Sequence, residues 1–253
     1  MAFEQSVSWW CFAREDIDPV DLLQTCKAIG YTAMELVPVD KFQLVRDHGL
    51  TIATHQLHVP IPAGINNPEN WDDIKRQSDA SLKLAQEWDI PFLIAFSGNR
   101  DGLDDERGAA NAIKHLELLA RDAESAGVVL LLELLNSKVN HPDYQCDRTA
   151  WGVQVVSAVG SPKARLLYDI YHMQVMEGDV IQTIRDYNQW FAHYHTAGVP
   201  GRNELSETQE LNYGAICRAI AETGFTGYVG QEFVPVGDWK AGLQQAYDVC
   251  NVN

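Results

Sequence analysis

The feature that most constrains the fold is a regular alternation of short apolar segments with longer amphipathic segments along the whole chain. Short runs of branched and aromatic residues separated by helical patterns are typical of repeated β-then-α units, whose strands pair in a parallel sheet. Eight such units fit into the 253 residues. The predicted strands span residues 6–10, 31–36, 51–57, 91–97, 128–135, 164–170, 191–197 and 227–233.

Eight βα units in about 250 residues predict an α/β protein of the (β/α)8 class, a TIM barrel. Segments 91–97 and 128–135 are apolar at nearly every position, as expected for strands covered on both faces. A doubly wound sheet is the alternative, but no glycine-rich phosphate-binding motif follows the first strand. Because no linker or low-complexity stretch divides the chain, we expect residues 1–253 to form a single TIM-barrel domain.

Three predicted helices have readable ends. Asp18 followed by Pro19 is typical of a helix start, and Gly30 is suited to the helix end. Two further helices are predicted over about 105–125 and about 213–222, each followed by a glycine that stops it.

Composition and charge narrow the class of partner. The 35 acidic and 19 basic residues give a formal net charge of -16. This charge argues against binding to nucleic acid or to an anionic membrane surface, because both require clustered Lys and Arg. It leaves a small-molecule substrate as the expected partner, and a homo-oligomer is compatible with the sequence.

The cysteines and the N-terminal segment predict a cytoplasmic protein. Five scattered cysteines without a CxxC pair indicate neither a disulfide framework nor a zinc-thiolate site. The segment MAFEQSVSWW lacks the basic and apolar regions of a signal peptide, and no apolar run approaches the roughly 18 residues of a transmembrane helix.

Polar residues near the ends of four consecutive predicted strands indicate a metal site. They are Glu133, Asp169, His195 and Glu232. In a barrel of this class catalytic groups come from the C-terminal ends of different strands. Carboxylates mixed with imidazole suit one divalent ion, Mg²⁺, Mn²⁺, Co²⁺ or Zn²⁺, and the absence of thiolates favours a catalytic site over a structural zinc.

Polar residues in and near the strands can also have a purely structural role instead of a role in a metal or substrate site. A single strand glutamate such as Glu35 or Glu133 is more often paired with Arg or Lys across the sheet than bound to a metal, and we expect that pairing for Glu35. His193 lies deeper than His195 on the same strand face and is predicted to be a hydrogen-bonded core histidine. His172 either hydrogen-bonds a backbone carbonyl or contacts substrate.

Two loops are candidates for contact with substrate. Arg202 lies in the Gly/Pro-rich segment 197–203, where its guanidinium is suited to grip a carboxylate or phosphate; the alternative is a solvated loop arginine. The turn-rich segment 60–71 suits a lid over the barrel mouth, and an inert surface loop is equally compatible with it.

Five runs carry a family resemblance. The runs are LLLELLN (130–136), LLYDIYHMQVMEGD (166–179), HYHTAGVPGR (193–202), ELNY (210–213) and YVGQEF (228–233). By these runs the chain resembles hydroxypyruvate isomerase and the related 2-oxo-tetronate isomerases, in the xylose isomerase-like TIM-barrel superfamily of sugar isomerases and epimerases. The resemblance is dense in the second half, and in the first half it rests on the order of elements and on QLHVP.

The resemblance implies roles for the strand-end residues. Glu133 and Glu232 match the acid/base glutamates, and these two with Asp169 and position 195 match the metal ligands. Three features depart from the family pattern. His195 stands where hydroxypyruvate isomerases have glutamine, Leu134 replaces a proline, and NELSETQELNY follows the loop arginine. These departures bear on the substrate more than on the class of reaction.

The reaction implied by the resemblance is a metal-dependent isomerisation of a small hydroxy-carbonyl acid, of which hydroxypyruvate to 2-hydroxy-3-oxopropanoate is the type. Arg202 and His58 would bind the substrate carboxylate, and His172 would position a hydroxyl. The alternatives are a sugar, 2-oxo-tetronate or inosose isomerase or epimerase, and a barrel that binds without catalysis. A metal endonuclease is a remote alternative, which the net charge of -16 disfavours.

Overall fold

The structure of the protein is a computed structural model that describes residues 2–252. Its eight strands follow one another in chain order in a closed β-barrel, which confirms the predicted (β/α)8 fold. The strands are β1 (Glu4–Ser8), β2 (Ala33–Glu35), β3 (Thr51–Gln56), β4 (Phe92–Ala95), β5 (Val129–Glu133), β6 (Ala164–Asp169), β7 (Phe191–Thr196) and β8 (Tyr228–Gln231).

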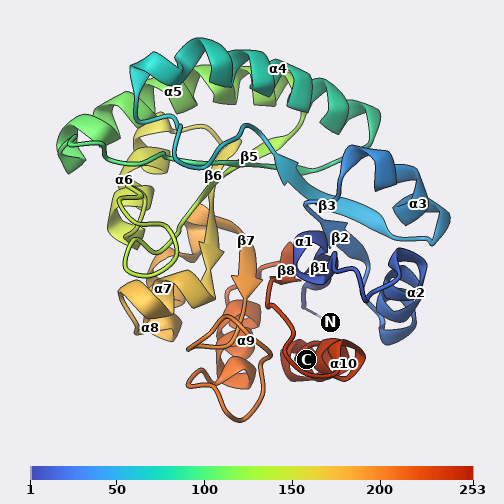
Figure 1. Ribbon diagram of the computed structural model, residues 1–253. Coiled ribbons are helices and arrows are strands. Elements are labelled where there is room, and N and C mark those ends of the chain that lie inside the picture. The colour runs from blue at the N-terminus through green and yellow to red at the C-terminus, as the bar shows by residue number, and fades with distance from the viewer. Residues whose placement is uncertain (1, 253) are drawn as a thin grey trace. The chain divides into compact units, whose positions relative to one another are not determined.

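The chain divides into two compact units, so the expectation of one domain over residues 1–253 stays a prediction. In the first unit (up to 53, 179–188 and from 193), β1 pairs in parallel with β2 and β8, and β7 pairs with β8. Helix α10 packs on α2 and α9 (Figure 1). The helices of this unit are α1 (Trp9–Phe12), α2 (Pro19–Ile29), α3 (Phe42–Asp47), α8 (Val180–Tyr187), α9 (Tyr213–Glu222) and α10 (Trp239–Cys250), with the 3-10 turn η1 (Val39–Lys41).

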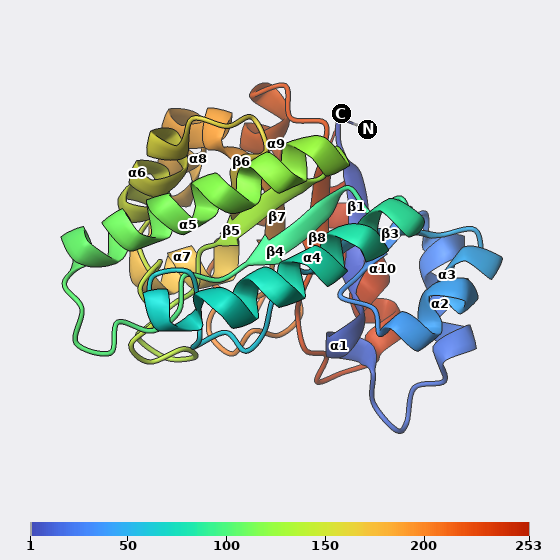
Figure 2. The ribbon, with the colours of Figure 1, turned by 90° about the horizontal axis from the view of Figure 1, so that it is seen from above.

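The second unit comprises residues 54–178 and 189–192. Here β4 pairs in parallel with β3 and β5, and β5 pairs with β6. Helix α5 packs against both α4 and α6, and Figure 2 shows α4 and α5 running side by side. The helices of this unit are α4 (Trp71–Glu87), α5 (Asp105–Ala126), α6 (Thr149–Val159) and α7 (Ile170–Met176), with the 3-10 turn η2 (Pro68–Asn70). The 3-10 turn η3 (Asn188–Trp190) begins at the last residue of segment 179–188 of the first unit and continues into this one.

The predicted helix ends are confirmed by their capping contacts. The Asp18 carboxylate accepts hydrogen bonds from the backbone N–H groups of the first turn of α2, and Gly30 ends that helix. Asp104 caps α5 in the same way, and Gly127 ends it in the left-handed conformation, with φ 78°. Each such cap satisfies backbone groups that a helix end leaves unpaired.

The first strand begins and ends two residues earlier than predicted. We expected a strand over 6–10, but β1 ends at Ser8 and the next residues form the short helix α1. Trp9 and Phe12 are buried, whereas residue Trp10 is 43% exposed. A short apolar run does not distinguish a strand from a buried helical turn by its periodicity, which explains the error. The turn carries Trp10 toward the end of β8.

Segment 60–71 is anchored within the second unit. Ile65 N–H donates to the Phe96 carbonyl at 3.1 Å, and Asn66 N–H donates to the Ser97 carbonyl at 2.9 Å. Gly64 lies so close to this strand end that an added Cβ would come within 2.1 Å of Gly98 N. These contacts hold the segment against the chain that follows β4, so the described conformation resembles a fixed loop more than a hinged lid.

All five cysteines are buried and reduced. Burial raises the pKa of the thiols of Cys26 and Cys146 well above the usual range. A buried thiol in apolar surroundings is a poor nucleophile. Within residues 2–252 no helix is both long enough and apolar enough to cross a bilayer.

Candidate functional site

The four predicted metal ligands lie at or next to the carboxyl ends of their strands. Glu133 and Asp169 are the last residues of β5 and β6, His195 lies one residue before the end of β7, and Glu232 directly follows β8. All four side chains are buried, with exposed fractions of 6% for Glu133, 1% for Asp169, 0% for His195 and 3% for Glu232. Buried acids at strand ends require compensation by donors, a cation or protonation.

At the end of β6 the Asp169 carboxylate is fixed by the chain that follows. Its Oδ1 accepts from the backbone N–H of His172 at 2.9 Å, so Asp169 is the N-cap of α7. Its other oxygen, Oδ2, lies 3.6 Å from His172 Nε2. The three-residue spacing in DIYH is therefore the spacing of a helix cap. Oδ1 is used by the helix cap, and Oδ2 is turned toward the imidazole of His172.

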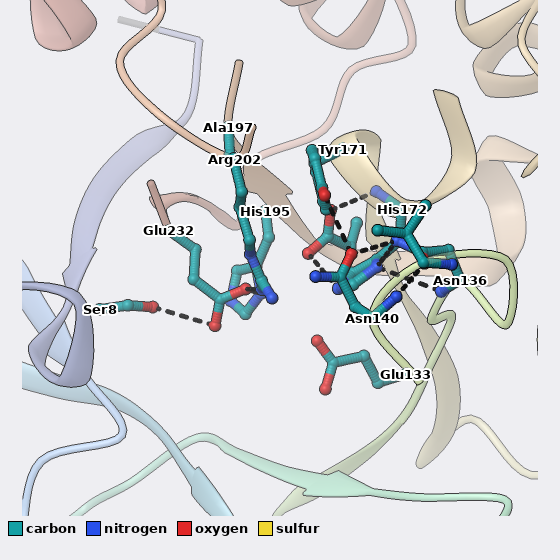
Figure 3. Close-up of polar contacts among 12 residues, drawn as sticks. Ser8, Glu133, Asn136, Asn140, Tyr171, His172, His195, Ala197, Arg202 and Glu232 are labelled. Atoms are coloured by element: carbon teal, nitrogen blue, oxygen red, sulfur yellow. Dashed lines mark hydrogen bonds and ion pairs between the residues drawn. The ribbon is translucent and has the colours of Figure 1, made fainter. Parts of the chain in front are cut away.

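His172 is held by the chain after β5. Its Nδ1 accepts from the backbone N–H of Asn136 at 3.1 Å and lies 2.6 Å from the Asn136 amide nitrogen (Figure 3). The backbone partner that the structure shows is thus an N–H, whereas the sequence analysis gave a backbone carbonyl or substrate as the two alternatives. Because Nδ1 accepts, the neutral ring carries its proton on Nε2, the nitrogen that faces Asp169.

The Asn136 side chain organises the loop that follows β5. Its Oδ1 accepts from the N–H groups of Val139 and Asn140, and its amide donates to Asn140 Oδ1 at 2.8 Å. Asn140 Oδ1 also accepts from the Tyr171 hydroxyl at 2.9 Å (Figure 3). The main-chain carbonyl of Glu133 accepts from Tyr144 at 2.9 Å. Uncharged hydrogen bonds therefore fix this end of the second unit.

At the end of β8 the Glu232 carboxylate is surrounded by side-chain donors of the first unit. Trp10 Nε1–H donates to Oε1 at 2.9 Å, and Ser8 Oγ lies 3.5 Å from the same oxygen. Oε2 forms a close ion pair with Arg202 and lies 3.2 Å from His195 Nδ1 (Figure 3). Burial by itself would raise the pKa of Glu232, but the charges of His195 and Arg202 hold it well below its usual range.

Arg202 lies in a loop after β7 that backbone hydrogen bonds hold in place. Its N–H donates to the Gly198 carbonyl at 2.9 Å, and its own carbonyl accepts from Val234 N–H at 2.8 Å, so the segment after β7 is tied to the segment after β8. The guanidinium carbon lies 5.1 Å from the centre of the Trp10 ring, a cation–π contact. Arg202 is therefore not a solvated loop arginine, and its partner in this structure is the carboxylate of Glu232.

Glu35 has different partners from those that the sequence suggested. Its buried carboxylate lies 3.0 Å from His193 Nε2 and 3.1 Å from His195 Nε2, and it accepts from the Ser6 hydroxyl. The sequence predicted an Arg or Lys partner, but the structure shows two histidines. Burial acts to raise the pKa of Glu35, and the two imidazoles outweigh it and lower that pKa.

The three residues Glu35, His193 and His195 also form a group that could hold a metal ion. Their nitrogen–oxygen distances of 3.0 to 3.1 Å are those of direct hydrogen bonds, and we interpret the group as a hydrogen-bonded cluster. His193 is buried within it, as expected for a core histidine. The signal for this cluster was the period-two HxH on β7, which points both rings to one face. Their carboxylate partner, Glu35, could not be identified from the sequence.

His58 is a neutral donor. Its Nε2 accepts from the backbone N–H of Phe96 at 3.2 Å, so the proton of the neutral ring lies on Nδ1. Burial lowers the pKa of His58 to about 4. Among residues 2–252 no hydrogen-bond partner of its Nδ1 is seen. The ring is thus suited to donate one hydrogen bond to a ligand, and not to attract a carboxylate by charge.

Comparison with known proteins places the chain in a family. Residues 23–250 match the family model described as xylose isomerase-like TIM barrel. The chain belongs to this family. Among relatives of this xylose isomerase-like protein, a 2-oxo-tetronate isomerase of Haemophilus influenzae is 27% identical over 240 residues, which cover 88% of this chain and 91% of that protein. A putative hydroxypyruvate isomerase of Xenopus laevis is 34% identical over 131 residues, covering 52% of this chain and 48% of that protein. The match therefore spans about half the length of that relative.

Solved structures agree with this xylose isomerase-like barrel. A protein from Brucella melitensis described as an AP endonuclease of family 2 superposes with a TM-score of 0.85 and 26% identity, over 95% of this chain and 97% of that chain. An L-ribulose 3-epimerase superposes with a TM-score of 0.79 at 18% identity, over 97% of this chain and 92% of that chain. At this low identity, the second likeness concerns the fold alone.

Proposed function

We propose that this protein is a divalent-metal-dependent isomerase of small hydroxy-carbonyl acids, with hydroxypyruvate to 2-hydroxy-3-oxopropanoate as the type reaction. The observation that carries the proposal is the placement of three acids and one histidine, all buried, at the ends of β5 to β8. The family match and the relatives named hydroxypyruvate isomerase and 2-oxo-tetronate isomerase support the class of reaction.

The metal ligands in this proposal are Glu133, Asp169, His195 and Glu232, the polar residues at or next to the ends of four successive strands. Three carboxylate oxygens and one imidazole nitrogen suit Mg²⁺, Mn²⁺, Co²⁺ or Zn²⁺, so the residues present fit such an ion. The Asp169 contacts agree with this role, since the helix cap uses Oδ1 and orients the whole carboxylate. When bound, the ion would polarise the substrate carbonyl and hydroxyl and make the C–H between them more acidic.

Glu133 and Glu232 are the proposed acid/base pair. One would take the proton from the first carbon, and the other would return a proton to the neighbouring carbon after an enediolate forms. The low pKa of Glu232 keeps its carboxylate ionised, as a proton acceptor must be, and it also makes the carboxylate a weaker base than a free glutamate. A ligating carboxylate can act in this way only if it binds through one oxygen or shifts during turnover.

The substrate-binding residues in this proposal are Arg202, His58 and His172. Arg202 would grip the substrate carboxylate, and to do so it would share its guanidinium between the substrate and Glu232. His58 would donate from its neutral Nδ1 to a substrate oxygen, which modifies the carboxylate role expected from the sequence. His172 presents Nε2 on the side of Asp169 and would position a hydroxyl.

A 2-oxo-tetronate is the second candidate substrate. The Haemophilus influenzae 2-oxo-tetronate isomerase matches 88% of this chain, whereas the hydroxypyruvate isomerase of Xenopus laevis matches 52%. Sugar and inosose isomerases or epimerases would use the same ligand set with a longer substrate. A nuclease activity, as named for the Brucella melitensis structure, is disfavoured by the net charge of -16.

The test is the exchange of substrate C–H with deuterated water, followed by NMR for hydroxypyruvate and for a 2-oxo-tetronate, with each of the four ions supplied. We expect the wild-type protein to catalyse exchange and isomerisation, and Glu232→Gln to lower both by about 10²- to 10⁴-fold.

The matched control is Glu222→Gln on α9, the same substitution at an exposed surface ion pair. It should keep the wild-type rate. Exchange at the wild-type rate in Glu232→Gln would remove Glu232 from the base role. A wild-type protein that is inert with every ion and both substrates would refute the proposed function.

A further inference from the structure

The Glu35 cluster connects the predicted ligand His195 to a buried carboxylate of another strand. Glu35 ends β2, and His195 lies near the end of β7. The His195 ring has Glu35 Oε2 3.1 Å from its Nε2 and Glu232 Oε2 3.2 Å from its Nδ1. Each nitrogen therefore faces a different carboxylate, and only one of the two carboxylates, Glu232, belongs to the proposed ligand set.

The surroundings of Glu35 are built to hold an anion at this place. Both Glu35 and His195 are fully buried, and an ionised carboxylate there is costly without donors. Ser6, His193 and His195 supply them. Because a carboxylate only accepts, it selects the ring form that carries a proton on each facing Nε2.

Gly230 of β8 makes room for this contact. Its register partner on β7 is His195, and a Cβ added at Gly230 would lie 2.2 Å from Glu35 Oε1 and 3.0 Å from His195 Cδ2. The glycine in YVGQEF thus leaves the space that Glu35 and the imidazole share, two residues before Glu232.

We propose that Glu35 is a positioning residue, whose carboxylate keeps the proton of His195 on Nε2 and so leaves Nδ1 as the nitrogen that binds the divalent ion. The inference rests on the proposed function, because it takes His195 as a ligand. Metal-ligating histidines commonly donate their second N–H to a carboxylate, which fixes the ring and raises its basicity. Glu35 acts through His195 and contacts no reacting atom.

The first test measures the ring form directly in the wild-type protein. Zn²⁺ is diamagnetic, so two-bond ¹⁵N–¹H correlations of the Zn²⁺-loaded protein report which nitrogen of each histidine carries a proton, and His195→Gln identifies the His195 signals. We expect the His195 proton on Nε2. A proton on Nδ1 in the zinc-loaded protein would overturn the inference without any variant at position 35.

The second test is the affinity of Glu35→Gln for Mn²⁺, measured by electron paramagnetic resonance of the free ion. The glutamine amide can donate to His195 Nε2, which moves the ring proton to Nδ1 and blocks the ligand nitrogen. We expect the Kd for Mn²⁺ to rise by about 10- to 100-fold. Glu4→Gln is the matched control, since it makes the same change of charge at an exposed residue of β1 and should keep the wild-type Kd.

The outcomes separate the two proposals. A wild-type protein that binds none of the divalent ions would refute the proposed metal site itself. A wild-type protein that binds Mn²⁺, with a folded Glu35→Gln that binds it equally well, would overturn only the role of Glu35. If Glu35→Gln does not fold, the ring form of the zinc-loaded wild type decides the question.

Discussion

The polar residues at the end of β6 are held differently from those at the end of β8. Asp169 and His172 are fixed by backbone N–H groups, through the cap of α7 and the chain after β5. Glu232 is fixed by side chains that carry or share charge, Arg202 and His195, together with the Trp10 indole. A backbone donor tolerates a neutral acceptor, whereas a buried cation requires its anion. Two acids that are both proposed metal ligands should therefore respond differently to the loss of charge.

The largest expected effect is on the stability of the metal-free protein. Glu232→Gln should lower the free energy of unfolding by about 3 to 5 kcal/mol, because it leaves the charge of Arg202 without its buried partner. Asp169→Asn should lower it by less than about 1 kcal/mol, since the asparagine oxygen still caps α7. Urea unfolding in the presence of EDTA measures both. Equal losses in the two variants would break the distinction between the two strand ends.

A smaller effect is expected on the pH dependence of the free energy of unfolding, through His58, another residue that accepts from a backbone N–H. Burial lowers its pKa to about 4 from the usual 6.5, so between these values the unfolded chain binds a proton that the folded ring does not. Stability then rises with pH. The part of the free energy of unfolding that comes from His58 is fully present above about pH 6.5 and is lost as the pH falls toward 4. The loss between pH 7 and pH 4.5 is about 2 to 3 kcal/mol.

The variant His58→Gln should lack this part of the pH dependence of urea unfolding. His48→Gln is the matched control for the change of side chain, at a half-buried ring that follows α3. The difference in pH dependence between the two variants is the part assigned to position 58. If His58→Gln loses as much stability between pH 7 and pH 4.5 as the wild type, the neutral state of His58 is wrong.

The smallest expected effect on stability comes from Gly230 of β8, which lies beside the Glu35 carboxylate. In Gly230→Ala the new methyl group meets the Glu35 carboxylate at 2.2 Å, and we expect a loss of about 1 to 3 kcal/mol in the free energy of unfolding. Gly214→Ala on α9 is the matched control. Its nearest neighbouring atom would be 3.6 Å away, and alanine favours a helix, so this variant should be neutral or up to about 1 kcal/mol more stable. Equal stability of both variants would show that Glu35 moves freely.

Much of the fold could be predicted because it depends on local patterns. Apolar runs alternating with capped amphipathic segments predicted eight strands and a barrel, and Asp18 and Gly127 marked helix ends that the structure confirms. The same pattern put Glu133 and Asp169 near strand ends, because each lies in the last part of an apolar run. Their catalytic and ligand roles stay predictions.

The contacts that the sequence did not predict join residues far apart in the chain. The pairing of Glu35 with two histidines of β7 spans 158 and 160 positions, and no local pattern encodes it. The ion pair of Arg202 with Glu232 depends on how the loop after β7 closes on the segment after β8. The sequence pattern predicts a strand at Trp10, where the structure has helix α1, because an aromatic run fits a strand and a buried helical turn equally well.

The enclosure of all five thiols has a practical consequence. A maleimide dye added to the folded protein finds no native cysteine to modify, since none is exposed and burial raises the thiol pKa at Cys26 and Cys146. A cysteine introduced at the exposed Thr208, on the loop that follows Arg202, would then be the one labelled site without removal of any native cysteine. A fluorophore there would report movement of the arginine loop in an otherwise unaltered chain.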